Sequence, residues 1–155
     1  NTLTRNGLVA RVMDFYKNLG KTPIELKKSI PGHIANRLQA VVWQETLALA
    51  KNGVASLEDI DRAISAGPGL RWSIFGPNQL FALANDAGLN GFVEHLGASF
   101  QSWWSTTDQV KFDNEVRTLI AESDVACQSS DERLKLICER DKLLVKILKN
   151  NGKKR

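Results

Sequence analysis

The sequence has little of what would point to a membrane, a metal centre or an oxidising compartment. It holds no run of about 18 consecutive apolar residues, so nothing in it predicts a membrane-spanning helix. Its two cysteines, Cys127 and Cys138, lack metal-ligand spacing and are too few for a disulfide framework. We therefore expect a cytoplasmic protein with no bound metal and no membrane partner.

The common catalytic fingerprints are also missing. There is no Gly-x-Gly-x-x-Gly after a strand, no P-loop, no zinc-ligand spacing and no Gly-x-Ser-x-Gly elbow. The chain begins at Asn1, and its single methionine is Met13. We therefore expect no cofactor to be bound by this chain alone, and we expect the chain to be a fragment of a longer protein.

Charge gives no sign of a nucleic-acid partner. The net charge is +4, with basic residues at Lys21, at 27–28 and at 153–155, and the remainder mixed with acids along apparent helices. A mixed pattern is typical of a solvated helix face, whereas a protein that follows phosphates presents a basic stripe. We expect no nucleic acid to bind, an expectation that salt-sensitive retention on DNA would contradict.

What the sequence does have is helical periodicity. A length of 155 residues suits one domain. Apolar spacing predicts helices near 8–19, 34–53, 57–64, 77–88, 91–104, 108–122 and 130–150. Breaks are predicted at Gly67-Pro68-Gly69 and Gly76-Pro77, and helix caps at Ser56, Thr107 and Ser129.

One short stretch, Thr22 to Lys27, predicts a strand. Pro23 stands near its start, and Ile24 and Leu26 alternate with charged residues. A single strand cannot satisfy its own backbone groups, so it needs a sheet from elsewhere. We expect a mainly α fold in which 1–29 are the helix–strand remnant of a missing domain and 30–155 form a helical domain.

The last predicted helix is apolar over a wide arc. One stripe holds Leu134, Ile137, Cys138, Leu144, Val145 and Leu148, and Leu136, Leu143 and Ile147 widen it. A helix on a monomer surface needs an apolar face of only about 100°. We expect this helix to pack on two sides, with a second subunit as one partner.

The stretch Pro31-Gly32-His33-Ile34-Ala35-Asn36-Arg37-Leu38-Gln39 resembles the motif that opens the C-terminal domain of the 3-hydroxyacyl-CoA dehydrogenase family. In this chain His33 stands where that family more often has Phe. Further matches follow in order at 53–61, 67–69 and 76–77. The resemblance implies a helical domain like the C-terminal domain of 6-phosphogluconate dehydrogenase. It also implies a preceding nucleotide-binding domain, which would account for the lone strand.

Within the family, the segment Gly69 to Pro77 departs from the acyl-CoA enzymes because its second glycine is displaced. This spacing looks more like the carnitine dehydrogenase and gulonate dehydrogenase (lambda-crystallin) branches. The pair Arg140-Asp141 in a long last helix also resembles carnitine dehydrogenases. A small polar 3-hydroxy acid is therefore as good a candidate substrate as a CoA thioester.

The resemblance implies one catalytic residue here, Asn36, whose amide would orient the substrate oxygen. A His–Glu base pair and NAD binding would belong to the missing domain. Asn36 has an alternative reading as a helix cap. Arg71 is a candidate for a substrate carboxylate and Trp72 for a trimethylammonium group, although Arg71 equally suits a surface ion pair and Trp72 a core or interface position. Trp103 and Trp104 are expected in a core or interface.

We therefore expect the dimerisation and substrate-closing part of an NAD-dependent 3-hydroxy acid or 3-hydroxyacyl-CoA dehydrogenase, inactive by itself and forming a homodimer. The rival interpretation is a stand-alone interaction module that docks a partner through the last helix and its basic end, Lys149 and Lys153 to Arg155. Deleting the chain after about Glu132 separates them, since an integral interface should collapse and a docking tail should leave a folded core.

Overall fold

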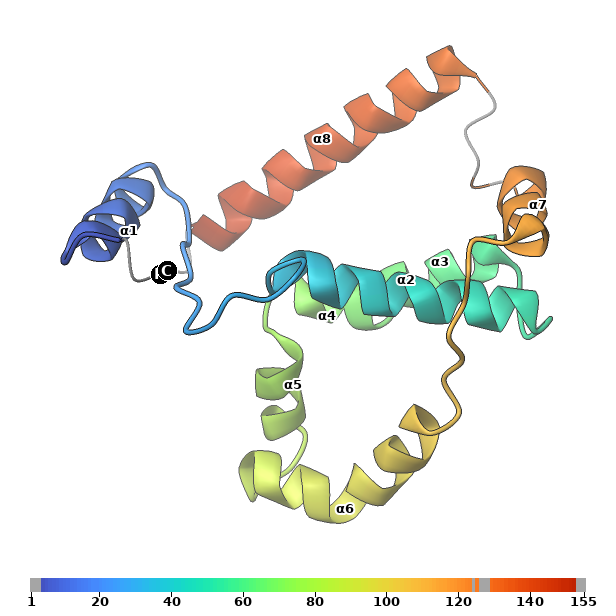
Figure 1. Cartoon of the computed structure of the whole chain (residues 1–155), viewed down its shortest axis with the longest axis horizontal. Coiled ribbons are helices and arrows are strands. Elements are labelled where there is room, and N and C mark those ends of the chain that lie inside the picture. Colours follow the sequence, from blue (N-terminus) through green and yellow to red (C-terminus); the bar gives the residue numbers. More distant parts are fainter. Residues whose placement is uncertain (1–3, 124, 126–128, 153–155) are drawn as a thin grey trace. The chain divides into compact units, whose positions relative to one another are not determined.

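The computed structural model describes residues 4–123, 125 and 129–152. Every regular element in these ranges is a helix (Figure 1). The helices are α1 (Leu8–Asn18), α2 (Ala35–Lys51), α3 (Leu57–Ala66), α4 (Pro68–Trp72), α5 (Pro77–Leu83), α6 (Gly88–Trp104), α7 (Asn114–Glu122) and α8 (Ser130–Gly152). None of the helices in the described part of the chain is long and apolar enough to cross a membrane.

The chain divides into two compact units, 1–41 and 42–155, with the boundary inside α2. In the first unit, Gly20 follows α1 with φ 70°, the left-handed conformation expected of a glycine after a helix. The predicted strand at 22–27 is wrong: these residues form no strand. The physical reason is that no segment among the described residues offers an edge with which their N–H and C=O groups can pair.

The second unit is built around a small core in which α2, α3 and α7 meet. Its buried members are Leu47, Ala50, Leu57, Ile60 and Val116. Val116 is fully buried, so the first turn of α7 is held against the end of α2. Trp43 and Phe112 extend this contact with ring centroids 5.3 Å apart.

Polar contacts reinforce the junction of α2 and α7. Lys51 Nζ lies 2.9 Å from Glu115 Oε2 and 3.4 Å from Asp113 Oδ2, and Asn52 donates to Asp108 Oδ2 at 3.0 Å. Hydrogen bonds from Lys51 to Glu115 and Asp113 raise its pKa above 10.5. The backbone N–H of Val116, with a further contribution from Lys51, lowers the pKa of Asp113 below 3.8.

A side-chain cap marks the start of each of the helices α3, α7 and α8. Ser56 Oγ accepts from the Asp59 N–H at 3.1 Å and Ser129 Oγ from the Glu132 N–H at 3.1 Å, which confirms both predicted caps. The predicted cap at Thr107 is wrong because its hydroxyl donates to the Trp104 carbonyl at the end of α6. Asp113 caps α7 instead, accepting from the Val116 N–H at 3.0 Å, so α7 starts later than predicted.

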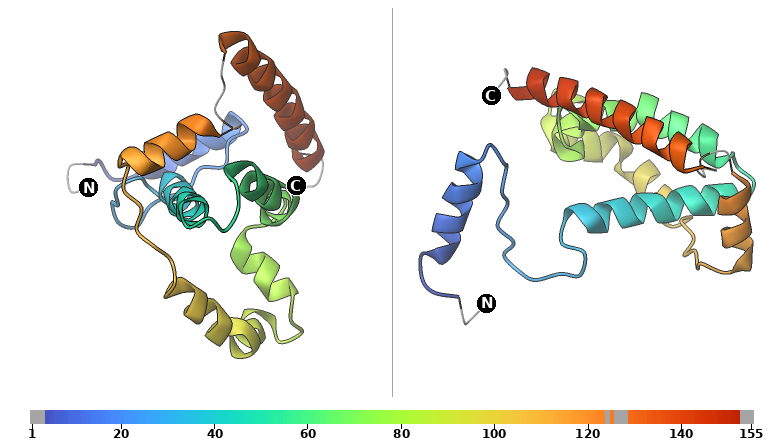
Figure 2. Two further views of the ribbon diagram at one scale, coloured as in Figure 1. Left: turned by 90° about the vertical axis from the view of Figure 1, so that its right-hand side faces the viewer. Right: turned by 90° about the horizontal axis from the view of Figure 1, so that it is seen from above.

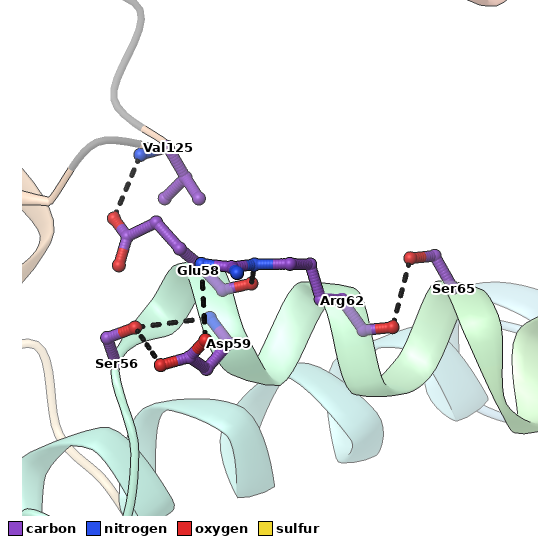
Figure 3. A network of polar contacts seen from close by, with 6 residues as sticks. All are labelled: Ser56, Glu58, Asp59, Arg62, Ser65 and Val125. Atoms are coloured by element: carbon purple, nitrogen blue, oxygen red, sulfur yellow. Dashed lines mark hydrogen bonds and ion pairs between the residues drawn. The ribbon is translucent and has the colours of Figure 1, made fainter.

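Figure 3 shows the polar side chains along α3. Arg62 Nη2 lies 3.2 Å from Asp59 Oδ1, and Ser65 Oγ donates to the Asp61 carbonyl at 2.7 Å. Glu58 Oε1 accepts from the backbone N–H of Val125 at 3.2 Å, a contact across 67 residues of sequence. All of these residues are exposed or half-buried, and their contacts run along the surface of α3 and form no buried reactive cluster.

The short helix α4 begins at Pro68, inside the break predicted at Gly67-Pro68-Gly69, and turns tightly against α3. A Cβ added at Gly67 would lie 2.6 Å from the Ala63 carbonyl oxygen, and one at Gly69 would lie 2.9 Å from the Ile64 carbonyl oxygen. Only glycine allows this approach of backbone to backbone. Glycine at both positions therefore sets where Arg71 and Trp72 emerge.

α8 runs as one uninterrupted helix from Ser130 to Gly152 (Figures 1 and 2). The buried core of the second unit includes no α8 residue among those that the structure describes. Most of its apolar side chains are exposed, from Ile147 at 42% to Leu148 at 68%. The predicted wide apolar arc is thus present and is not covered by that core.

Candidate functional site

The candidate catalytic residue, Asn36, lies in the first turn of α2. It is the second residue of that helix, so it lies inside the helix and not at the capping position before it. Its side chain is exposed. The first turn of a helix has N–H groups without intrahelical partners and a partial positive charge, so an oxygen that gains negative charge is stabilised there. An amide donor at this point can add a hydrogen bond to such an oxygen.

The turn before α2 has an unusual backbone. Gly32 and His33 both have positive φ, 77° and 50°, and the His33 N–H donates to the Ile30 carbonyl at 3.1 Å. Gly32 suits this conformation, while a residue with a Cβ at φ 50° is uncommon. A Cβ on Gly32 would also lie 3.4 Å from the Arg37 backbone nitrogen. The Pro31-Gly32 pair therefore serves to bend the chain sharply into α2 and to present Asn36 in the first turn.

An open hollow of about 320 Å³ lies beside this turn, within the first unit. Its lining is mainly apolar, with His33 as its titratable member. The lining residues are Thr22, Ile24, Leu26, His33, Ile34 and Ala35. Three of the residues predicted as a strand thus line the hollow, together with Ala35, which precedes Asn36 in the chain.

Arg71 and Trp72 lie on α4 in the second unit, and both are exposed, Trp72 at 42%. Adjacent helix residues point about 100° apart, so the two side chains do not face the same side of α4. Because Trp72 is exposed, it is not a core residue. The interface position is then its remaining structural alternative to a substrate contact. Asn36 belongs to the first unit, and Arg71 and Trp72 belong to the second.

Sequence reasoning missed an aromatic groove on α5 and α6. Phe81 stacks on Phe92 with centroids 4.6 Å apart and planes 12° apart, and Phe100 meets both edge-on. An open groove of about 630 Å³ runs along these rings and is lined also by Asn78, Glu94 and Gln101. The spacing of Phe92 and Phe100, close to two helical turns, is the signal that could have revealed it.

The two other tryptophans lie at the end of α6. Trp103 is 57% and Trp104 68% exposed, so neither is a core residue. Trp103 packs on Phe100 with centroids 4.9 Å apart, and Trp104 lines the groove. The expectation that they belong to an interface stays a prediction.

No group of three or more His, Cys, Asp or Glu side chains in the described ranges could hold a metal ion. His33 lines the hollow, and no carboxylate is among the other residues that line it. The first unit therefore offers an amide donor at a helix start with an open apolar hollow nearby, and the second unit separately offers a guanidinium and an indole on α4.

Comparison with known proteins identifies the family of the stretch that contains Asn36, Arg71 and Trp72. The family described as 3-hydroxyacyl-CoA dehydrogenase, C-terminal domain, matches residues 32–110. The chain is 34% identical over 151 residues to an L-carnitine dehydrogenase of Streptomyces coelicolor, covering 97% of this chain and 48% of that protein.

Similar relatives come from other organisms. A 3-hydroxyacyl-CoA dehydrogenase of Gibberella moniliformis is 35% identical over 150 residues, covering 94% of this chain and 47% of that protein. An L-carnitine dehydrogenase of Pseudomonas aeruginosa is 33% identical over 141 residues, covering 90% and 44%. The chain spans about half the length of these curated relatives.

Proposed function

The chain belongs to the 3-hydroxyacyl-CoA dehydrogenase family, and from this premise we propose that it is the helical C-terminal part of an NAD-dependent dehydrogenase. Its reaction would oxidise the 3-hydroxyl of a 3-hydroxy acid or 3-hydroxyacyl-CoA to a keto group. The observation that carries the proposal is the family match over residues 32–110, which includes Asn36 in the first turn of α2.

This chain's own residues do not fit a dinucleotide, because it has no glycine-rich loop between a strand and a helix. We therefore assign NAD binding and the catalytic base to a part of the whole protein outside these residues. In the whole protein Asn36 would donate a hydrogen bond to the reacting oxygen and hold the hydroxyl toward the base. This chain by itself would then bind no NAD and turn over no substrate.

The relatives named L-carnitine dehydrogenase favour a substrate with both a carboxylate and a quaternary ammonium group. Arg71 offers a planar guanidinium for the carboxylate, and Trp72 an aromatic face for the cation. We propose that these two side chains, which leave α4 in different directions, contact opposite ends of such a substrate. A 3-hydroxyacyl-CoA is the alternative, supported by the Gibberella relative.

The test is an NADH absorbance assay on the whole protein that contains this chain. L-carnitine, 3-hydroxybutyryl-CoA and L-gulonate are compared as substrates, with the 155-residue chain as a second sample. We expect turnover of one of the three by the whole protein and none by the chain alone. NAD reduction by the purified chain would overturn the assignment of its role, and turnover of none of the three would overturn the proposed activity.

We also propose that the chain forms a homodimer. The exposed apolar side chains of α8 favour this, because a helix apolar over so wide an arc needs more than one packing partner. The same surface supports the rival reading as a docking module for another protein. Light scattering on the purified chain separates the two: a stable dimer supports the first, and a folded monomer the second.

A further inference from the structure

A subset of the apolar residues of α8 forms a pattern that reads the same in both directions along the helix. Six of them lie on one side of the helix: Leu134, Ile137, Cys138, Leu144, Val145 and Leu148, here called the α8 seam. Asp141 stands at their midpoint. The pairs equidistant from Asp141 are Leu134 with Leu148, Ile137 with Val145, and Cys138 with Leu144. Two copies related by a two-fold axis through Asp141 would therefore match apolar residue to apolar residue along the whole seam.

Five of the six seam side chains are exposed, and the sixth, Ile137, is half-buried. Leu134, Leu144, Val145 and Leu148 are each about half exposed or more, and Cys138 is exposed. The spacing of three and four residues is that of helices packed in a shallow left-handed supercoil. The seam covers an arc of about 120° at 100° per residue, which is wide enough for one partner helix.

Charge selects the orientation. The first half of α8, 130–141, carries four acidic and three basic residues, and the second half, 142–152, carries three lysines and no acid. A parallel pair would set the two lysine-rich halves side by side. An antiparallel pair sets each of them beside the partner's acidic half, and it also opposes the two helix dipoles.

Asp141 at the midpoint is the residue that this packing must accommodate. It is paired within its own helix, because Arg140 Nη2 lies 2.8 Å and Nε 2.9 Å from Asp141 Oδ1. At a two-fold axis two such pairs would face each other and form a four-charge network of alternating sign. A polar group at one central position fixes the register of paired helices at a cost in stability.

From these observations we propose that two copies of this chain associate through antiparallel pairing of their α8 seams, centred on Asp141. The proposal rests on the homodimer put forward above and names the element, the orientation and the register of its interface. Leu134 of one copy contacts Leu148 of the other, and Ile137 contacts Val145.

Cysteine cross-linking tests the orientation in the full chain. In a background with Cys127→Ser and Cys138→Ser, the variants are Leu134→Cys, Leu148→Cys, both together, and Asp141→Cys. Antiparallel pairing places position 134 about 21 Å from the partner's 134, at 1.5 Å per residue, and a disulfide cannot bridge that distance. We expect oxidation to link the double variant and Asp141→Cys, and to link neither single variant at 134 or 148.

Two outcomes overturn the proposal while leaving the homodimer intact. Linkage of Leu134→Cys or Leu148→Cys alone would show a parallel pair. No linkage in any variant, with light scattering still reporting a dimer, would place the interface elsewhere. A monomer at all concentrations would remove the homodimer itself, and the inference with it.

A matched pair of substitutions tests the face. Leu144→Asp lies in the seam, while Leu143→Asp makes the same chemical change about 160° from the middle of the seam. The two leucines are similarly exposed, at 47% and 51%. We expect Leu144→Asp to raise the dimer dissociation constant at least 100-fold and Leu143→Asp to change it less than tenfold. The reverse order would overturn the assignment of the seam.

Discussion

Asn36 is a residue whose side-chain chemistry can be changed without disturbing its helix. In the whole protein, Asn36→Asp removes the amide donor, and a carboxylate in the first turn of α2 is favoured by the helix dipole. We expect kcat to fall by roughly 100- to 1,000-fold, the usual loss when one fixed donor is removed. The measurement is steady-state NADH formation, with circular dichroism to show that the helix is kept.

Gln39→Glu is the control for this change, because it makes the same amide-to-carboxylate replacement one turn further along α2. It should leave kcat within a factor of about three. Equal losses in the two variants would show a general effect of added negative charge, and the role assigned to Asn36 would be wrong.

Trp72 offers a second prediction, about what it binds. If its indole faces a quaternary ammonium group, Trp72→Ala should raise KM for L-carnitine by about tenfold, which corresponds to a cation–π contact of roughly 1–2 kcal/mol. Trp72→Phe should recover part of the loss. KM for a 3-hydroxy substrate without the cation should not change, and a parallel rise for both substrates would point to a structural role for Trp72.

At the scale of the element, the α3–α4 turn depends on the missing side chain of Gly69. Alanine there would gain helix propensity, but its Cβ would lie 2.9 Å from the Ile64 carbonyl oxygen, a backbone atom that cannot move aside cheaply. We expect Gly69→Ala to destabilise the chain by about 1–3 kcal/mol in urea unfolding. Gly76→Ala is the matched control, since its Cβ would meet nothing within 4 Å and its φ of −67° suits any residue.

The cap of α7 makes a prediction about pH. The pKa of Asp113 is lowered below 3.8 by the Val116 N–H, so its stabilising contribution is complete above that pH and is lost as the pH falls through the folded-state pKa. We expect the urea midpoint of Asp113→Ser, which keeps an oxygen acceptor but no charge, to fall less steeply than that of the unaltered chain below pH 3.8. Identical slopes would show that Asp113 does not contribute to the acid sensitivity.

These elements also show what sequence could and could not predict. The sequence predicts the helix caps at Ser56 and Ser129 correctly, because a cap depends only on its own side chain and on the backbone three residues later. The predicted cap at Thr107 is wrong because its hydroxyl donates to the Trp104 carbonyl at the end of α6. The packing of Val116 in the core sets the start of α7 at Asp113. The strand at 22–27 failed for a related reason, since alternation describes one chain segment while a strand needs two.

The candidate site divides in the same way. The position of Asn36 within a helix start followed from the turn residues Pro31 and Gly32, whose backbone preferences are local. The aromatic groove on α5 and α6 required knowing that Phe81 meets Phe92 and Phe100, which is a contact between two helices. Sequence spacing places each ring on its helix but does not say which helix faces it.

At the scale of the whole molecule, the relation between folding and assembly can be measured by removing α8. The core of the second unit draws its buried residues from α2, α3 and α7, and none of the described α8 residues belongs to it. Ending the chain after Glu132 should therefore keep the core helices formed while the dimer becomes a monomer, in place of the collapse that the sequence alone predicts for an integral interface. Light scattering reads the assembly, and circular dichroism reads the helices.

The concentration dependence of unfolding completes this test. A chain that dimerises through α8 unfolds at a higher temperature as its concentration rises, by mass action, whereas the shortened chain should unfold at the same temperature at every concentration. If the shortened chain loses all cooperative unfolding, α8 is part of the fold itself and its apolar arc is covered within the subunit. If the full chain is already independent of concentration and the shortened one still folds, α8 is a docking surface for a different protein, and the rival reading takes the place of the dimer.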